Sequence, residues 1–140
     1  MNQGELFTTL LIDLQRIFRT EVVPKDLSYS QVLAIIIIPD GGIEMSELAC
    51  TLGLENSTVT RLIARLERNN FVTREKSEVD KRSVNVFLDQ KGVLLQNDIE
   101  QKIDRINNQI FLKNNQVEKE LFLENLSLFQ WSLKKTFLKK

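Results

Sequence analysis

Residues 57–67 read Ser-Thr-Val-Thr-Arg-Leu-Ile-Ala-Arg-Leu-Glu, and this stretch decides our prediction of the fold. Its apolar residues recur at three- and four-residue spacings, a pattern typical of an amphipathic helix. The positions predicted to form the inner face are Val59, Leu62, Ile63 and Leu66. Asn56 or Ser57 can cap the start of this helix, and Asn69-Asn70 marks its end after Arg68.

A shorter helix is predicted directly before this one. Ser46 can cap a helix over residues 47–52, and Gly53 breaks it. A short strand is expected around Ile43 and Glu44. Two short helices joined at a glycine are typical of a helix-turn-helix unit.

A charged β-hairpin is predicted to follow the second helix. Residues 71–74 read as one strand, and the alternation over residues 84–88 predicts a second. Between them, Lys76 to Ser83 is polar and charged, as expected for a hairpin tip. A helix-turn-helix followed by such a hairpin is a winged helix-turn-helix.

Helices are predicted on both sides of this unit. One covers residues 5–20 and ends at Val22-Val23-Pro24, and a buried helix capped by Ser28 ends at the turn over residues 39–42. Beyond the hairpin, a long helix covers residues 90–113 and another follows Asn114-Asn115. The predicted fold class is mainly α with a small β-hairpin wing.

An isoleucine stripe runs along the predicted long helix. Ile99, Ile103, Ile106 and Ile110 step by four, three and four residues, which resembles a heptad pattern. The stripe fits either a seam between two subunits or an internal core. The sequence leaves both open.

The composition excludes several classes of catalytic site. The chain of 140 residues has no histidine and one cysteine, so Ser-His and Cys-His nucleophile pairs are impossible. A zinc site would need carboxylates as its main ligands, which is uncommon. We therefore expect neither an enzyme nor a bound metal or cofactor.

No apolar run approaches the roughly 20 residues that a membrane-spanning helix needs, because Val32 to Ile38 is the longest compact one. Residues 1–5 lack the basic start and the cleavage site of a signal peptide. We expect a protein of the cytoplasm with no membrane partner.

Charge is distributed unevenly although the formal net charge is zero. Residues 1–56 hold three Lys and Arg against eight Asp and Glu, whereas residues 57–91 hold eight against five. The remaining residues, 92–140, hold eight against six. The basic excess begins where the second short helix begins, and such asymmetry between segments indicates a nucleic-acid partner better than the total does.

The second helix carries residues suited to duplex DNA. The major groove admits one α-helix, and hydroxyl groups in the first turn of that helix can hold phosphate oxygens. Ser57, Thr58 and Thr60 supply these hydroxyls. Arg61 and Arg65 lie one turn apart and can donate to guanine edges or to phosphates, although solvated surface charge is the simpler alternative.

The hairpin tip carries further cations. A long cation on a thin hairpin can enter the narrow minor groove, and Arg82 is the candidate for this contact. Arg74, Lys76 and Lys81 are additional DNA-contact candidates, with solubilising surface charge again the alternative. Our hypothesis for Asp80 is that it pairs with Arg82 or Arg74 and fixes the shape of the wing.

The order of these motifs resembles the MarR family of bacterial and archaeal regulators over the whole chain. The resemblance rests on Leu27-Ser28-Tyr29-Ser30-Gln31-Val32-Leu33, Ser46-Glu47-Leu48-Ala49, residues 57–67, Asp80-Lys81-Arg82-Ser83 and Val86-Phe87-Leu88-Asp89-Gln90-Lys91-Gly92. The ordered combination is specific, although each piece alone is weak.

The resemblance implies a single domain over residues 1–140. Residues 28–92 would form the winged helix-turn-helix unit, and residues 1–24 and 93–140 the helices that interlock two subunits in a homodimer. Such dimers bind pseudo-palindromic operators, and many are repressors released by small aromatic ligands or by oxidation. The family's recognition-helix positions map to Ser57, Thr58, Thr60 and Arg61, and its wing Asp-x-Arg maps to Asp80 and Arg82.

Two positions depart from the family pattern. Leu88-Asp89 stands where Leu-Thr is usual, and Phe71 stands where Gly is usual. Neither change threatens the fold, and Asp89 can still cap the following helix because Asp also caps well.

Three further hypotheses concern ligands and partners. Leu14, Phe18 and Tyr29 are apolar candidates for an effector pocket between the dimerisation helices and the winged unit. Cys50 fits a small, partly buried residue better than a redox switch, because no basic residue adjoins it in sequence. The alternative to a DNA-binding repressor is a winged-helix module that binds only proteins.

Overall fold

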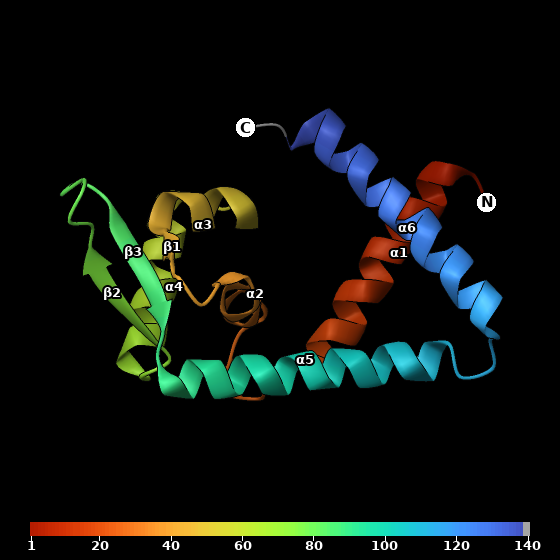
Figure 1. Ribbon diagram of the computed structural model, residues 1–140, viewed down its shortest axis with the longest axis horizontal. Coiled ribbons are helices and arrows are strands. Elements are labelled where there is room, and N and C mark those ends of the chain that lie inside the picture. Colours follow the sequence, from red (N-terminus) through yellow and green to blue (C-terminus); the bar gives the residue numbers. More distant parts are fainter. Residues whose placement is uncertain (139–140) are drawn as a thin grey trace. The chain divides into compact units, whose positions relative to one another are not determined.

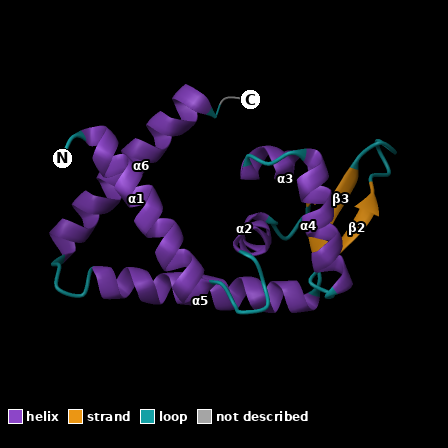
Figure 2. Ribbon diagram, turned by 180° about the vertical axis from the view of Figure 1, so that it is seen from behind, coloured by secondary structure: helices purple, strands orange, loops and turns teal. Residues whose placement is uncertain are grey.

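The computed structural model describes residues 1–138 and is mostly helical, with one small antiparallel sheet, as predicted (Figures 1 and 2). Its elements are α1 (Gln3–Ile17), the π-helix η1 (Phe18–Val22), α2 (Tyr29–Ile37), β1 (Ile43–Glu44), α3 (Met45–Leu52), α4 (Asn56–Arg68), β2 (Val72–Lys76), β3 (Val84–Leu88), α5 (Gln90–Ile110) and α6 (Gln116–Phe137). The chain divides into two units, Met1–Ile103 and Asp104–Lys140. No helix within residues 1–138 is both long and apolar enough to cross a membrane.

The start of α2 confirms the prediction made from Ser28. The Ser28 hydroxyl accepts a hydrogen bond from the Gln31 backbone N–H at 3.1 Å, and the Gln31 side chain accepts one from the Ser28 N–H at 2.8 Å. This reciprocal capping box satisfies two backbone donors that a helix start leaves without intrahelical partners. Gln31 is only 8% exposed, so its side chain is also part of the packed interior, whereas Ser28 is exposed.

Two predicted helix caps are wrong. Helix α3 begins at Met45 and α4 at Asn56, and neither Glu44 nor Glu55 before them makes a side-chain cap bond. Ser46 lies inside the first turn, where its hydroxyl donates to the Glu44 carboxylate at 3.0 Å. Both helices therefore begin with first-turn N–H groups that no side chain caps.

The other boundaries are close to those predicted. The first helix begins at Gln3 instead of Glu5, and its last turn continues as a π-helix to Val22. The long helix ends at Ile110 instead of Lys113, because residues 111–113 form a turn before α6. Length and periodicity predicted these elements better than their terminal residues, where helix ends fray.

The wing is a three-stranded sheet in the order β1-β3-β2. Strands β2 and β3 pair antiparallel from Val72 opposite Leu88 to Lys76 opposite Val84, and Ile43 of β1 pairs with Val86. The prediction for β3 is confirmed, whereas β2 runs two residues further than predicted and includes Lys76. The short β1 closes the outer edge of β3 and ties the hairpin to the start of α3.

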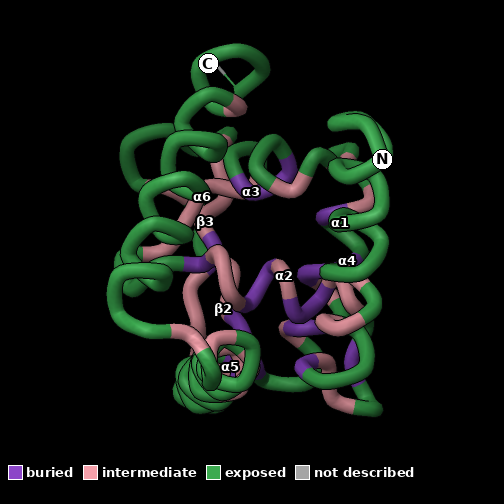
Figure 3. The backbone as a smooth tube through the Cα atoms, turned by 90° about the vertical axis from the view of Figure 1, so that its right-hand side faces the viewer, coloured by how far each residue is buried: buried purple, intermediate pink, exposed green. Residues whose placement is uncertain are grey.

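The core lies beneath the helix-turn-helix and the sheet (Figure 3). The four residues predicted for the inner face of α4 are all buried. They share the interior with side chains that are less than 2% exposed, including Val32, Ile35, Ile38, Leu48, Val72, Val86 and Ile99. Burial of a large aliphatic side chain contributes about 1.5–3 kcal/mol, so this cluster is the main source of stability for the winged unit.

Close backbone packing joins α5 to the base of the sheet. A β-carbon on Gly92 would lie 2.1 Å from the Phe71 carbonyl oxygen, which no real side chain tolerates. The same carbonyl accepts a hydrogen bond from the Asp89 N–H at 2.9 Å. Phe71 itself is buried, and the Asp89 carboxylate accepts a hydrogen bond from the Thr73 hydroxyl. The two departures from the family pattern are thus both packed into this junction.

A side-chain amide ties α5 to the end of α2. The Gln96 Nε2 atom donates to the carbonyl oxygens of Ile35 and Ile38, each at 2.9 Å. The last carbonyls of a helix lack intrahelical partners, so this amide satisfies groups that would otherwise need water.

The isoleucine stripe divides along its length. Ile99 is fully buried, Ile103 and Ile106 are half-buried, and Ile110 is 59% exposed. The first position of the stripe therefore belongs to the internal core of the unit Met1–Ile103. The last position presents an apolar side chain to solvent in this single chain.

Candidate nucleic-acid interface

The turn between α3 and α4 depends on Gly53. This residue has φ of 68°, the left-handed conformation in which a β-carbon is strained. The Leu54 N–H donates to the Ala49 carbonyl at 3.0 Å, which closes the end of α3. The tight turn starts α4 three residues after Gly53, and the predicted helix-turn-helix is confirmed.

The outer face of α4 carries four of the predicted contact residues. Ser57, Thr60, Arg61 and Arg65 are exposed, and Thr58 is half-buried. The Thr60 hydroxyl donates to the Asn56 carbonyl at 2.8 Å, so its oxygen still can accept a bond. The buried apolar residues of the opposite face hold this surface outward, as an amphipathic helix requires.

The tip of the wing is shaped by Asp80. Its carboxylate accepts hydrogen bonds from the Arg82 backbone N–H at 3.0 Å and from the Ser83 hydroxyl at 3.4 Å. The hypothesis that Asp80 forms an ion pair with Arg82 or Arg74 is wrong, because it binds the main chain of Arg82 instead. A short Asp side chain commonly bonds the backbone two residues on in this way.

An ion pair that the sequence reasoning missed connects the wing to α4. The Arg74 Nη2 atom lies 2.9 Å from the Glu67 carboxylate, and the Arg74 backbone N–H donates to the same group at 3.1 Å. These hydrogen bonds hold the pKa of the Glu67 carboxyl below its ordinary value. The signal available in the sequence was a Glu near the end of one element and an Arg within the next. Spacing alone could not pair them.

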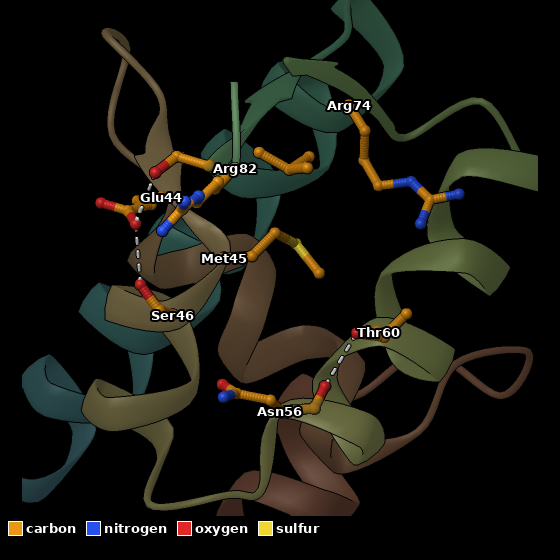
Figure 4. A pocket seen from close by; sticks show the side chains of 9 residues that line it. Glu44, Met45, Ser46, Asn56, Thr60, Arg74 and Arg82 are labelled. Carbon is orange, nitrogen blue, oxygen red and sulfur yellow. Dashed lines mark hydrogen bonds between the residues drawn. The ribbon is translucent and has the colours of Figure 1, made fainter. Parts of the chain in front are cut away.

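A cleft of about 240 Å³ separates α4 from the wing (Figure 4). Arg74 and Arg82 reach it from the sheet side, Ser46 from α3, and Asn56 and Thr60 from α4. The Glu44 carboxylate on its wall accepts hydrogen bonds from the hydroxyls of Ser46 and Ser83. The predicted recognition helix and the predicted wing therefore face a common cleft.

The wing carries two cations besides Arg74 and Arg82, namely Lys76 and Lys81. Lys81 and Arg82 are exposed in the turn after β2, and Lys76 is exposed at the end of that strand. Lys76 and Lys81 do not line the cleft. Arg74 differs from them, because its guanidinium is already engaged by Glu67.

Two of the three candidate effector residues are in contact. The rings of Phe18 and Tyr29 meet edge to face with centroids 5.7 Å apart, and the Arg19 guanidinium lies 4.4 Å from the Tyr29 ring centroid. Leu14 is exposed one turn earlier on α1. The arrangement is an aromatic pair beneath a cation at the π-helical turn.

Cys50 is exposed on α3, so the expectation of a partly buried residue is wrong. Its neighbours Leu48 and Ala49 lie on the buried face of this short helix. Because successive side chains rotate around the helix axis, the Cys50 side chain lies on the exposed face.

Comparison with known proteins agrees with this architecture. Residues 27–84 match the family model described as "MarR family". The regulator TtmR of Methylorubrum extorquens is 32% identical over 78 residues, which cover 55% of this chain and 40% of that protein. The regulator MgrA of Staphylococcus aureus is 28% identical over 95 residues, covering 66% of this chain and 65% of that protein. The match therefore spans less than two thirds of either relative.

Solved structures share the fold over nearly the whole chain. Streptococcus pneumoniae FabT in complex with DNA superposes with a TM-score of 0.80 at 23% identity, covering 97% of this chain and 96% of that one. The relatives named above are transcriptional regulators, in agreement with the expectation that the chain is not an enzyme. Residues 27–84, which contain the helix-turn-helix and the first part of the wing, match the MarR family model over less than half of this chain, and the solved structures show that the chain has a winged helix-turn-helix fold.

Proposed function

We propose that this protein is a sequence-specific, duplex-DNA-binding transcriptional regulator. The observation that carries the proposal is the pairing of an exposed hydroxyl- and arginine-bearing face on α4 with a basic wing across one cleft. The relatives TtmR and MgrA are named HTH-type transcriptional regulators, and FabT was solved in complex with DNA.

Helix α4 is the proposed reading element. It enters the major groove, where Arg61 and Arg65 donate to guanine edges or to phosphates. Ser57, Thr58 and Thr60 bind phosphate oxygens together with the uncapped N–H groups of the first turn. Base contacts from the arginines give sequence specificity, and the hydroxyl contacts set the register.

The wing is the proposed second contact. Arg82 enters the adjacent minor groove, where the negative potential is strong, and Lys76 and Lys81 contact phosphates on either side. Asp80 orients Arg82 through its backbone bonds. Arg74 contributes mainly through Glu67, by holding β2 against α4, and it also lines the cleft.

The cleft between α4 and the wing has a place in this scheme. The ridge that separates a major groove from the neighbouring minor groove is one sugar–phosphate backbone. When α4 and the wing occupy the two grooves, that backbone passes through the cleft lined by Asn56, Thr60 and Arg82.

A homodimer acting on a pseudo-palindromic operator is part of the proposal. Residues 28–92 would serve as the DNA-binding unit, and residues 1–24 and 93–140 as the dimerisation helices. In support, α1 and α6 have no buried residue in the single chain. Their exposed large apolar side chains include Leu6, Leu10, Leu11, Leu14, Leu121, Leu126 and Trp131.

Repression with release by a small aromatic effector completes the proposal. The edge-to-face pair of Phe18 and Tyr29 offers ring surfaces for such a ligand, with Leu14 as a third apolar side chain. This element of the proposal rests on the family resemblance and on that contact.

Salt dependence tests the DNA-binding function. With about 6–10 phosphate contacts, affinity for duplex DNA should fall by roughly 10³–10⁵ between 50 and 200 mM salt. Weak binding that does not respond to salt would instead favour a winged-helix module that binds only proteins.

Arg82→Ala tests the wing. We expect weaker operator binding with the fold and the dimer intact, as measured by fluorescence anisotropy and circular dichroism. Unchanged affinity would remove the wing from the mechanism. Footprinting should also show two half-sites about one helical turn apart, and a single asymmetric patch would contradict the two-fold arrangement.

A further inference from the structure

A second groove lies on α4, along a side that the wing does not reach. It is lined by Thr58, Arg61, Arg65 and Arg68 of α4, by Lys25 of the preceding loop and by Ser28 at the start of α2. We propose that this basic groove binds the sugar–phosphate backbone of a DNA strand beside the major groove that α4 occupies. The inference rests on the proposed function and assigns it two contact residues, Lys25 and Arg68.

The groove is continuous along α4. Its two parts share Ser28, Gln31 and Arg65, so they form one channel from Thr58 in the first turn to Arg68 in the last. Arg61, Arg65 and Arg68 are spaced four and three residues apart and therefore lie on one face of the helix. None of these residues lines the cleft shared with the wing.

The far wall of the groove is rigid. It consists of the capping box at the start of α2, where Ser28 and Gln31 bond each other's backbone N–H groups. Leu27 beside it is buried and anchors the loop that carries Lys25. Because hydrogen bonds hold this wall in place, the loop that carries Lys25 need not move when DNA binds opposite Arg61, Arg65 and Arg68.

The groove carries unpaired positive charge. Lys25, Arg61, Arg65 and Arg68 are all exposed, and Asp26 is the only acidic residue among those that line it. Within residues 1–138, ion pairs join Arg16 to Asp13, Arg74 to Glu67 and Lys102 to Asp98, so none uses a cation of the groove. Cations held together without an acidic partner suit a polyanion.

The geometry favours duplex DNA over other polyanions. The major groove is about 12 Å wide and an α-helix with its side chains is about 10–12 Å across, so both flanks of α4 come close to phosphates. One flank has the cleft beside the wing. The basic groove gives the other flank the cations that a second backbone requires.

The test removes the two cations that the proposed function does not already use. We compare Lys25→Ala/Arg68→Ala with the charge-matched control Lys113→Ala/Lys119→Ala, which removes two exposed lysines outside the winged unit. The probe is a random-sequence duplex of about 30 base pairs, because phosphate contacts carry non-specific binding. Binding is measured by anisotropy from 50 to 200 mM salt, with thermal unfolding of each variant alongside.

The groove predicts a specific change in the salt dependence. Each lost phosphate contact should reduce the slope of log affinity against log salt by about 0.9, so the double variant, which removes two contacts from each subunit of the proposed homodimer, should lose about 3.6. The control should keep the wild-type slope. Lys25→Ala alone should lose about 1.8 from the same slope. Because Lys25 lies in an exposed loop, this variant also controls for a folding defect caused by the change at Arg68.

The outcomes separate this inference from the proposed function. If wild-type protein binds the duplex with a steep slope and the double variant keeps that slope, the groove is not a backbone site although the function stands. Equal losses in variant and control would show a general charge effect and would also overturn the inference. If the wild-type protein shows no salt-dependent binding, the proposed function itself fails.

A strand-specific measurement sharpens the assignment. Neutral methylphosphonates placed at single phosphates should weaken wild-type binding at positions on both strands bordering the major groove. In the Lys25→Ala/Arg68→Ala variant, the positions on one strand should lose their effect. Tight capture of an acidic peptide, with no change in duplex binding by the variant, would reassign the groove to a protein partner.

Discussion

The winged-helix segment (residues 28–92) and the outer helices (α1 and α6) differ in how they are stabilised. Helices α2, α3 and α4 each bury two or more residues, whereas α1 and α6 bury none. Large apolar side chains that fill a core in the first region remain exposed in the second. The winged-helix segment has an interior of its own, and the outer helices have apolar faces that a second surface must cover.

Side-chain capping divides the helices differently, because α2 begins with a capped turn as α1 and α6 do. Helices α1 and α6 begin with Asn2 and Asn115, whose side chains bond the backbone of the first turn. Helices α3 and α4 have no side-chain cap. Tertiary packing stabilises α3 and α4 without a side-chain cap, whereas the outer helices bury no residue and begin with local side-chain bonds.

The largest expected effect is on the association of the outer helices. In the proposed homodimer, Leu10→Glu removes an apolar contact from the interface and places a charge there, once in each subunit. Because burial of one leucine contributes about 1.5–3 kcal/mol, the dissociation constant should rise by at least about 100-fold. Sedimentation equilibrium measures this change.

Val79→Glu is the matched control for this substitution. Val79 is 98% exposed on the wing, so an added charge there should leave the oligomeric state unchanged. A Leu10→Glu protein that remains as dimeric as wild type would remove α1 from the interface.

The next effect is on the core of the winged-helix segment. Leu66→Ala leaves a cavity under α4 and should lower the free energy of unfolding by about 2–5 kcal/mol. The loss should not depend on protein concentration, unlike that of a conservative Leu10→Ala. Chemical denaturation at two concentrations tests this contrast, and a concentration-dependent loss at Leu66 would contradict it.

A smaller loss is expected where α5 begins. Gly92→Ala forces the new methyl group against the Phe71 carbonyl, and overpacking of this kind costs about 1–3 kcal/mol. Gly41→Ala is the control, because a β-carbon there meets nothing within 4 Å. Equal thermal stabilities of the two variants would show that the backbone around Gly92 and Phe71 can shift at little energetic cost.

The smallest effect concerns the link between the wing and α4. The pKa of Glu67 is lowered in the folded protein, so its ion pair stabilises the fold above the unfolded-state value near 4.5 and loses this effect as the pH falls through the folded-state value. For a pair this exposed, the contribution is at most about 1 kcal/mol. Glu67→Gln should flatten the pH dependence of stability as the pH falls below about 4.5. The same slope in both proteins would show that the pair contributes nothing.

Periodicity predicted most of the fold. The inner face of α4, the strand β3 and the break at Gly53 follow from spacing and residue type, and the structure confirms them. The caps at Ser46 and at Asn56 or Ser57 were wrong, because a polar residue near a helix start can occupy several positions that the sequence does not distinguish. The contact roles of the α4 and wing residues stay predictions.

The sequence by itself determined the order of helices and strands, the polar outer face of α4 and the absence of histidine chemistry. The first two properties follow from the spacing of residues along the chain, and the third follows from composition alone. Only the tertiary structure decided that Glu67 binds Arg74, that Asp80 binds the backbone of Arg82, and that Lys25 lies in a groove with Arg68. Such pairings join residues from different elements or depend on the conformation of a turn, and the packing of the buried core fixes their distances.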